Sequence, residues 1–282
     1  MKPVVFAKSR EMASFSAEAR RAGRSIGFVP TMGALHEGHL SLMRRARADN
    51  AVVVASIFVN PTQFGPSEDL SKYPRTFQQD LDGCERALVD AVFAPDAKEM
   101  YPDGFDTFVV QERLPAVMCG ASRPGHFRGV LTICCKLFNV VAPDVVYLGQ
   151  KDYQQAQIIK RMVADLQMPL RIEVCPTIRE RDGLAMSTRN RYLSASERAD
   201  AACLYRALNL AGQMAAQGAD DPGKLIEAMR NVIAQVPSAV IDYVVIADPE
   251  TLQPLDRVGT RALAALAVKF GGTRLIDNIP IP

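Results

Sequence analysis

The sequence predicts an α/β fold in which a parallel β-sheet is followed by a smaller α+β domain. Up to Pro176, short apolar runs alternate with helical patterns, which is typical of βαβ units. The run AVVVASIFV at 51–59 is nearly all apolar, as expected of a strand buried on both faces of a parallel sheet. After Pro176 the order changes to two helices followed by three strands. We therefore predict two domains, 1–176 and 177–282.

The elements of the first domain follow in order along the chain. Strands are predicted at 25–30, 51–59, 91–95, 144–149 and 171–176. Helices are predicted at 38–49, 76–90, 129–141 and 152–166, with Thr76 as the N-cap of the second. Because ligands of such sheets bind beyond the carboxyl ends of the strands, functional motifs should begin where strands stop.

The second domain opens with a predicted helix at 194–217. Ser194 and Glu197 form the sequence pattern of a capping box at its start. A second helix is predicted at 222–235, and strands are predicted at 239–248, 262–270 and 273–279. Two helices followed by three strands indicate a small α+β domain.

The composition indicates a globular protein of the cytoplasm. Of 282 residues, 48% are hydrophobic and 23% are charged. The net charge is +2 and no basic block stands out, so nothing calls for nucleic acid. The first residues contain too short an apolar run for a secretory signal, and no apolar stretch reaches the ~20 residues that span a bilayer. The six cysteines show no CxxC spacing, which favours reduced thiols in the cytosol.

Two of the three histidines lie in the stretch PTMGALHEGHLSLM at 30–43, where the first predicted strand ends. His36 and His39 are three residues apart, so on a first helical turn their rings can share one side. Gly38 lets a ligand approach the backbone, and a helix N-terminus offers N–H groups to an anion. The pattern suits a phosphate-bearing ligand.

Two other interpretations of these histidines stay open. HEGH resembles a shortened HExxH zinc motif, although that motif needs a spacing of four residues and a third ligand, and none stands nearby. The pair can also be ordinary residues at a helix start.

Two further motifs follow predicted strands. NPTQF at 60–64 places Asn60 and Gln63 where they either bind a ligand or act as turn residues. GQKDYQQ at 149–155 places Lys151 at a helix start, where the helix dipole disfavours a cation unless an anion joins it. Gln155 lies about one helical turn further on and can face the same site.

The stretch GLAMSTRNRYL at 183–193 opens the second domain. It combines hydroxyl groups with guanidinium groups, which suit phosphate oxygens, although a solvated loop is the alternative. The third histidine, His126, lies in GHFRGV, where we expect a structural role rather than contact with a substrate.

Taken together and in this order, the motifs resemble those of the pantoate–β-alanine ligase family, the pantothenate synthetases. The resemblance runs from about residue 26 to 193 through PTMGALHEGHLSL, FVNPTQFG, YPRT, GHFRGV, KLFN, GQKDYQQ and MSTRNRYL. Nucleotidylyltransferases and class I aminoacyl-tRNA synthetases share the HxGH motif and a Rossmann-like sheet. The combination with NPTQF and KDYQQ is more specific to the ligases.

The resemblance implies a reaction and its cofactors. ATP and pantoate give pantoyl adenylate and pyrophosphate with Mg²⁺, and the amine of β-alanine then attacks the acyl carbon to give pantothenate and AMP. The metal is expected on the ATP, with no metal site built from protein groups alone. The resemblance also implies a homodimer.

The resemblance also implies roles for individual residues. Its catalytic set has His39 as the proton donor and His36 as its partner on the phosphates, together with Lys151, Ser187 and Arg189. The nucleotide site would comprise Met32, Gly33, Ala34, Leu35, His36, Glu37, Gly38, His39, Gly149, Gln150, Lys151, Asp152, Ile178, Met186, Ser187, Thr188 and Arg189. Pantoate would contact Gln63 and Gln155, with Asn60, Tyr73 and Asp80 in the same neighbourhood.

The departures from the family pattern are small. Gln79 stands where an acid often precedes Asp80, Thr188 stands where serine is common, and Cys134 and Cys135 replace small apolar residues. Two competing functions remain: a plain nucleotidylyl transfer, and a catalytically silent module that binds a nucleotide or tRNA. The intact set of histidine, lysine, serine and arginine side chains and the near-neutral charge argue against the silent module.

Overall fold

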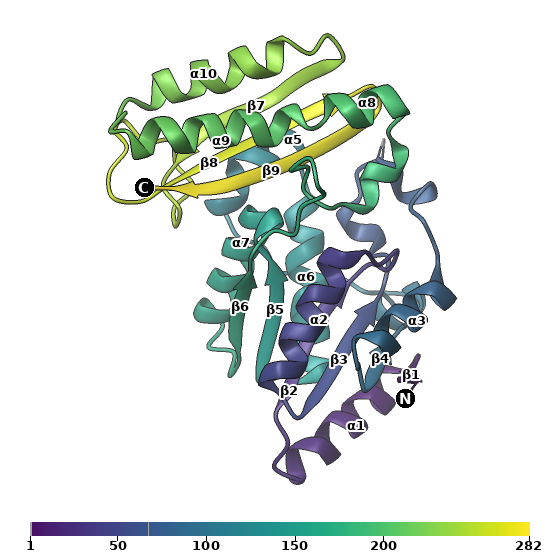
Figure 1. Cartoon of the computed structure of the whole chain (residues 1–282). Helices are drawn as coiled ribbons and strands as arrows, with labels where there is room; N and C mark the ends of the chain where they lie inside the picture. The colour runs from purple at the N-terminus through teal and green to yellow at the C-terminus, as the bar shows by residue number, and fades with distance from the viewer. Residues whose placement is uncertain (1, 67) are drawn as a thin grey trace. The chain divides into compact units, whose positions relative to one another are not determined.

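The structure is a computed structural model that describes residues 2–66 and 68–282, and it contains two compact units (Figure 1). The first consists of the chain up to Pro115 with Arg123–Gly149 and Gln155–Pro176. The second consists of Ala116–Ser122, Gln150–Gln154 and Thr177–Pro282. The two short segments of the second unit bind each other, since the main-chain N–H of Cys119 donates to Gln154 Oε1 (3.0 Å). The division into domains 1–176 and 177–282 stays a prediction.

A six-stranded parallel sheet forms the centre of the first unit. Its strands are β1 (Val4–Phe6), β2 (Ile26–Thr31), β3 (Val52–Ile57), β4 (Ala91–Phe93), β5 (Val145–Gly149) and β6 (Arg171–Cys175). They are ordered β1-β4-β3-β2-β5-β6, and every pair is parallel. The direction of winding changes between β2 and β5, and in such sheets the crevice beyond this point is where ligands bind. The α/β class with its parallel sheet is confirmed.

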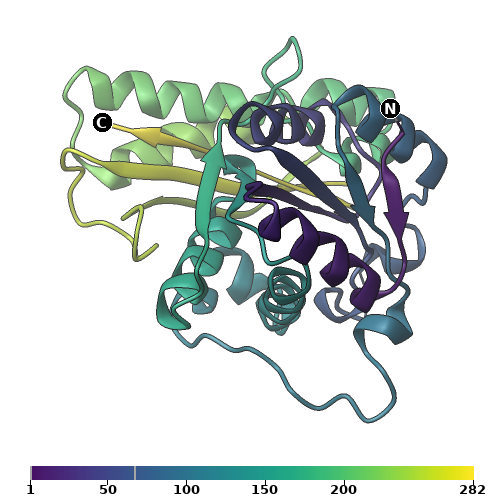
Figure 2. The ribbon, with the colours of Figure 1, turned by 90° about the horizontal axis from the view of Figure 1, so that it is seen from below.

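Helices cover both faces of this sheet (Figure 2). The helices of the first unit and the one that follows β5 are α1 (Ser9–Arg21), α2 (Glu37–Asp49), α3 (Phe77–Arg86), α4 (Ala97–Met100), α6 (His126–Val141) and α7 (Tyr153–Asp165). On one face, Met43 of α2 and Cys84 of α3 share a buried cluster with Val53 and Tyr147 of the sheet. On the other face α1 and α6 lie side by side, and Phe138 of α6 packs edge-on against Phe28 of β2. The apolar strands are thus buried from both sides, as the run at 51–59 predicted.

The first unit also differs from the expected elements. The sequence did not predict β1 and α1, because β1 is a three-residue edge strand with Val4 and Val5 exposed, and α1 buries only Met12, Ser16 and Ala19. Thr76 does precede α3, but its side chain does not accept a hydrogen bond from the helix. The helix ends at Arg86, earlier than residue 90.

The second unit contains a three-stranded antiparallel sheet with helices on it (Figure 1). The elements are α5 (Met118–Ser122), α8 (Ala195–Asp200), α9 (Cys203–Ala216), α10 (Pro222–Ala234), β7 (Ala239–Ala247), β8 (Ala262–Phe270) and β9 (Thr273–Ile281). Leu204 and Leu208 of α9 and Met229 of α10 pack with Leu266 and Phe270 of β8 in one core. The three strands predicted for this region are confirmed.

The helix predicted at 194–217 is two helices, with a break at 201–202. At the break the main chain makes shorter turns, in which the N–H of Ala202 donates to Ala199 O (3.4 Å) and that of Leu204 to Ala201 O (3.2 Å). The predicted capping box is confirmed, since the N–H of Glu197 donates to Ser194 Oγ (3.3 Å) and that of Ser194 to Glu197 Oε2 (2.8 Å).

The six cysteines are free thiols, and five of them are buried. Burial raises the pKa of Cys84 and that of Cys134 to about 12, so both thiols stay protonated at neutral pH. The described residues include no helix with the length and apolar character needed to span a membrane.

Candidate functional site

The sequence motifs of the first unit follow three neighbouring strands, in the order β3-β2-β5. The histidine-containing turn follows β2, NPTQF follows β3, and Gly149 at the start of GQKDYQQ is the last residue of β5. Because all three strands are parallel, their carboxyl ends lie at one edge of the sheet. The expectation that motifs begin where strands stop is therefore confirmed.

The turn after β2 is held by a buried carboxylate. Asp80, 2% exposed on α3, accepts hydrogen bonds from the N–H groups of Ala34 (3.0 Å) and Leu35 (2.8 Å). Gly33 has φ +79°, and a Cβ there would lie 3.0 Å from Asp80 Oδ2, so glycine is needed for both conformation and space. Thr76 Oγ1 donates to the same carboxylate (3.2 Å). This placement favours a role for Asp80 in shaping the turn rather than in direct contact with a substrate.

The two histidines of the turn fix each other at the start of α2. His36 is the N-cap residue, and its Nδ1 accepts from the N–H of Gly38 (3.1 Å). His39 Nδ1 accepts from the N–H of His36 (3.3 Å), and the ring centroids are 4.1 Å apart. Because each Nδ1 acts as an acceptor, a neutral ring carries its hydrogen on Nε2. Each neutral imidazole thus has its donor at Nε2, a group whose chemistry suits a phosphate oxygen.

The other residues of this turn have separate partners. Glu37 of the expected nucleotide set forms an ion pair with Arg44, which lies further along α2. Met32 Sδ accepts from Gln63 Nε2 (3.1 Å), so the structure brings the turn after β2 and the motif after β3 together.

The Gln63 side chain is oriented by Asn60. Asn60, 1% exposed, donates from Nδ2 to Gln63 Oε1 (3.0 Å) and to Gly129 O (3.1 Å). Its Oδ1 accepts from the hydroxyl of Tyr101 (2.8 Å). Asn60 therefore acts on Gln63, and the Gln63 amide presents its NH₂ group rather than its oxygen on the side of Met32. Sequence reasoning missed Tyr101, which lies in an irregular stretch with no recognisable motif.

Tyr73 and Gln155 occupy different environments in the first unit. Tyr73 is buried and packs edge-on against Phe64, with ring centroids 6.0 Å apart. Gln155 lies in the first turn of α7, partly exposed. Gln63 and Gln155 therefore follow the strands on either side of β2.

In the second unit, Lys151 lies in a short 3₁₀ turn at Gln150–Asp152. The main-chain carbonyls of Gln150 and Lys151 accept from Asn278 Nδ2 of β9 (3.1 and 2.9 Å). The Lys151 ammonium lies 3.4 Å from Asp152 Oδ1, and its side chain is 19% exposed. The lysine is thus held by its main chain, and its side chain is largely shielded from solvent beside Asp152. Asn278 was not predicted, because its partners are more than 120 residues away in the sequence.

The segment 178–186 of the expected nucleotide site forms a small hairpin in the second unit. The N–H of Met186 donates to Ile178 O (2.9 Å), and Gly183 turns the chain with φ +91°. Arg179 binds both carboxylate oxygens of Asp277 (2.6 and 3.0 Å). Burial raises the pKa of Asp277, and the Arg179 guanidinium opposes that rise. The hairpin is thereby fixed to β9, the strand that also holds the main chain of Lys151.

Ser187 and Thr188 follow this hairpin. Ser187 caps the 3₁₀ turn Thr188–Tyr192, and its Oγ accepts from the N–H of Arg189 (3.2 Å) while its hydroxyl hydrogen can serve another acceptor. Thr188 is buried, which favours a packing role for its side chain over a phosphate contact. In the part of the chain that the structure describes, no group of three or more His, Cys, Asp or Glu residues is arranged to hold a metal ion.

The fold defines a Rossmann-like α/β protein, in which polar motifs follow neighbouring strands at the switch point of a parallel sheet and two histidines lie at a helix start. The family model of the pantoate-beta-alanine ligases matches residues 4–280. The chain belongs to the pantoate–β-alanine ligase family.

Similar proteins agree with this assignment. The pantothenate synthetase of Moorella thermoacetica is 55% identical over 94% of both chains, and that of Thermotoga neapolitana is 53% identical over 95% of this chain and 96% of its own. The crystal structure of pantothenate synthetase from Thermus thermophilus has a TM-score of 0.93 at 44% identity, covering 98% of both chains. The Francisella tularensis ligase, crystallised with β,γ-ATP and β-alanine, has a TM-score of 0.81 at 36% identity, over 98% of this chain and 97% of its own. The chain is thus an enzyme of pantothenate biosynthesis that condenses pantoate with β-alanine in an ATP-dependent reaction.

Proposed function

We propose that the condensation proceeds in two half-reactions through pantoyl adenylate. The pantoate carboxylate attacks the α-phosphorus of ATP and pyrophosphate leaves. The amine of β-alanine then attacks the acyl carbon, and AMP leaves with the oxygen that pantoate contributed. The adenylate is needed because a carboxylate is a poor acyl donor until its oxygen becomes part of a good leaving group.

The orientation of His36 and His39, each with its Nδ1 on a backbone N–H, is the observation that carries this proposal. Negative charge moves onto the pyrophosphate oxygens as the α-phosphorus bond breaks. Donors that are already oriented stabilise that charge without reorganising, which is a large source of rate enhancement. The backbone amides fix both rings through Nδ1, so the donors are oriented before the substrate arrives.

The remaining nucleotide contacts are assigned by charge. Lys151 and Arg189 carry fixed positive charge for the phosphates, and Ser187 adds a hydroxyl donor. In this proposal the nucleotide set includes the turn from Met32 to His39, the segment 149–152, Ile178 on the adenine side, and 186–189. The assignment is supported by the position of Lys151 just beyond β5 and by the main-chain anchoring of its turn.

Mg²⁺ enters this proposal as an ion bound to ATP. Magnesium prefers oxygen ligands and commonly binds through substrate phosphates rather than a cage of protein groups. The site residues fit that role, since they are donors and cations suited to phosphate oxygens. When bound, the ion neutralises part of the polyphosphate charge.

Two further features belong to the same proposal. The enzyme works as a homodimer, on the resemblance to its family. It acts in the cytoplasm, where free thiols such as the buried Cys84 and Cys134 persist in reduced form.

Measuring AMP release from ATP and pantoate, with and without β-alanine, tests the proposed chemistry. The ligase predicts AMP formation only when the amine is supplied, a pyrophosphate burst without it, and loss of both when Mg²⁺ is omitted. A stable product that retains the nucleotide would instead support plain nucleotidylyl transfer, and no turnover with intact ATP binding would support a silent module. Stoichiometric zinc lost together with activity on chelation would revive the zinc interpretation.

Replacing Gln63 or Gln155 with Ala should impair pantoate use while ATP affinity stays near normal. Both side chains are neutral, so they contribute little to holding the charge of ATP. Loss of either amide leaves a polar group of pantoate unpaired in a closed site, which costs about 1–3 kcal/mol of binding free energy. It also leaves the pantoate carboxylate less firmly oriented toward the α-phosphorus of ATP.

Calorimetry with ATP and the pyrophosphate burst at varied pantoate measure the two effects separately. Gln78→Ala is the matched control, because Gln78 is exposed on α3 and bonds only Asp82 among the contacts described. A collapse of ATP affinity with an unchanged dependence on pantoate would move these glutamines to the nucleotide site.

A further inference from the structure

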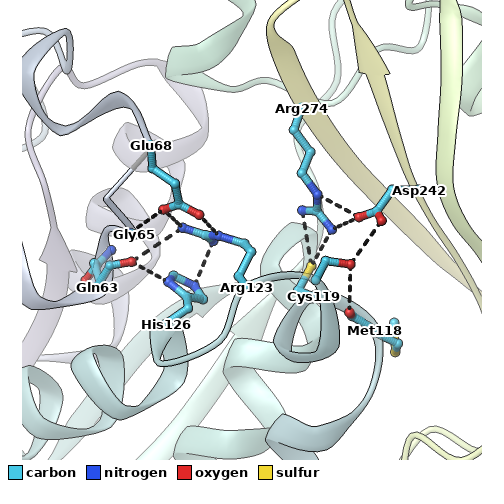
Figure 3. Close-up of polar contacts among 10 residues, drawn as sticks. Gln63, Gly65, Glu68, Met118, Cys119, Arg123, His126, Asp242 and Arg274 are labelled. Atoms are coloured by element: carbon cyan, nitrogen blue, oxygen red, sulfur yellow. Dashed lines mark hydrogen bonds and ion pairs between the residues drawn. The ribbon is translucent and has the colours of Figure 1, made fainter.

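A cluster of three charged or titratable side chains lies against the main chain of Gln63 in the first unit (Figure 3). Arg123 binds Glu68 through two hydrogen bonds, from Nε to Oε1 (2.6 Å) and from Nη2 to Oε2 (2.7 Å). Arg123 Nη1 lies 2.9 Å from His126 Nε2, and His126 Nδ1 lies 2.8 Å from Gln63 O. The cluster therefore joins the loop after Gln63 to the segment that precedes α6 and to its first turn.

The donors and acceptors of this cluster admit one tautomer of His126. A guanidinium N–H can only donate, so His126 Nε2 is the acceptor from Arg123. The hydrogen of the neutral ring therefore lies on Nδ1 and is donated to the carbonyl of Gln63. This is the opposite tautomer to that of His36 and His39, in which Nδ1 accepts from the backbone. His126 is thus arranged to hold a main-chain carbonyl rather than to meet a phosphate.

The ion pair at the other end of the cluster is largely shielded from solvent. The side chains of Arg123 and Glu68 are 16% and 24% exposed. Burial raises the pKa of Glu68, but hydrogen bonds and charge from Arg123 outweigh burial and bring that pKa to about 2. Glu68 is therefore ionised at neutral pH and keeps the guanidinium in place. The N–H of Gly65 also donates to Glu68 (3.2 Å), which closes the loop after Gln63 on the same carboxylate.

The start of α6 also contacts the NPTQF motif directly. A Cβ on Gly129 would lie 2.3 Å from Thr62 O, so only glycine allows this approach. Gly129 O in turn accepts from Asn60 Nδ2, the group that also orients the Gln63 amide. Gln63 is therefore fixed at two points, with its side chain held by Asn60 and its main-chain carbonyl held by His126.

We propose that Arg123 and His126 are positioning residues for the Gln63 amide, and through it for pantoate. This inference rests on the proposed contact between Gln63 and pantoate. Neither residue is assigned to the substrate or the reacting atoms. They fix the main chain of Gln63, so their loss lets the Gln63 amide occupy a wider range of positions. The pantoate carboxylate is then held less firmly in line with the α-phosphorus of ATP.

The test compares steady-state kinetics of His126→Ala, His126→Asn and Arg123→Lys. We expect His126→Ala to raise the KM for pantoate about tenfold, as the loss of one well-placed hydrogen bond would, with an unchanged KM for ATP. His126→Asn places an amide donor where Nδ1 was and should restore most of the pantoate KM. Arg123→Lys keeps the charge but loses the paired bonds to Glu68, so it should also raise the KM for pantoate.

Two controls make the outcome decisive. Arg257→Lys changes an exposed arginine paired with Asp220 in the same way, and it should leave both KM values unchanged. The second control is Gln63→Ala, which tests the contact between Gln63 and pantoate separately from the positioning role of Arg123 and His126. If Gln63→Ala leaves the pantoate KM unchanged, the proposed contact itself fails.

If Gln63→Ala raises the pantoate KM but His126→Ala does not, or if His126→Asn behaves like His126→Ala, the positioning role is wrong. Hydrogen exchange of the Gly65 N–H gives a second readout that needs no substrate. The positioning role predicts faster exchange in His126→Ala and Arg123→Lys, and unchanged exchange would overturn it.

Discussion

Replacing His39 with Ala should slow pyrophosphate formation in a single turnover by about 10²–10³, the usual loss for one transition-state donor. The charge that develops on the leaving pyrophosphate needs a donor already in position, and His39 Nε2 is one of the two that this turn provides. ATP binding should weaken far less, because the donor acts mainly on charge that appears in the transition state.

His39→Asn is the control for local structure. His39 Nδ1 accepts from the N–H of His36, so an alanine at this position removes half of the capping arrangement of α2 as well as the donor. An asparagine oxygen can take over that acceptor role, whereas its short side chain cannot reach the place of Nε2. We expect both variants to be slow and His39→Asn to keep the thermal stability of the wild type.

The measurements are a quenched single-turnover assay of pyrophosphate at saturating ATP and pantoate, together with thermal unfolding. Recovery of the rate in His39→Asn would show that His39 acts by capping the helix, and His39 would then lose its assignment as proton donor.

The sequence predicted the elements whose signal is local and missed those whose signal is not. The strand at 51–59 and the helix at 222–235 carry strong apolar patterns with clear ends, and both are present as β3 and α10. The edge strand β1 has only three residues, of which Val4 and Val5 are exposed, and the mostly polar α1 has only a narrow buried stripe. Neither element therefore has an apolar pattern strong enough to be predicted from the sequence. The break between α8 and α9 lies in the run ADAAC, where every residue is compatible with one continuous helix.

For the site, the sequence indicated which residues have the chemistry to bind a phosphate or a hydroxyl group. It did not indicate which other residues hold these side chains in position. His36, His39 and Lys151 stand beside strand ends and could be singled out from their chemistry. Asp80 and Asn60 were placed near substrate, and their burial and full use of hydrogen bonds favour support of the turn and of Gln63 instead.

The supporting residues on β9 and α6 could not be predicted, because their partners are distant in the sequence. Asn278 meets the turn of Lys151 from more than 120 residues away, and His126 meets Gln63 from 63 residues away. Such contacts depend on how the elements pack, and no local pattern of a single sequence encodes them.

Replacing Lys151 with Met should slow adenylate formation by about 10²–10³ and weaken ATP binding as well. Methionine keeps most of the length of the side chain and removes its charge together with its hydrogen-bond donors. Lys151 lies in the 3₁₀ turn just before α7, where the helix dipole makes a cation unfavourable in the free protein. The ammonium is therefore stabilised most when the polyphosphate of ATP is bound, both before and during the transfer. The affinity for ATP and the rate of adenylate formation should therefore fall together in Lys151→Met.

The fold should survive this substitution, because the turn is held through main-chain atoms. Asn278 donates to the carbonyls of Gln150 and Lys151, and both bonds are independent of the lysine side chain. Lys160→Met on the exposed side of α7 is the matched control, since it removes the same charge from the helix that follows the turn of Lys151. Calorimetry with ATP and the single-turnover assay should separate the two variants clearly. If Lys151→Met matches Lys160→Met in both measurements, the ammonium of Lys151 plays no part in handling the phosphates and another cation, with Arg189 the first to examine, must take its place.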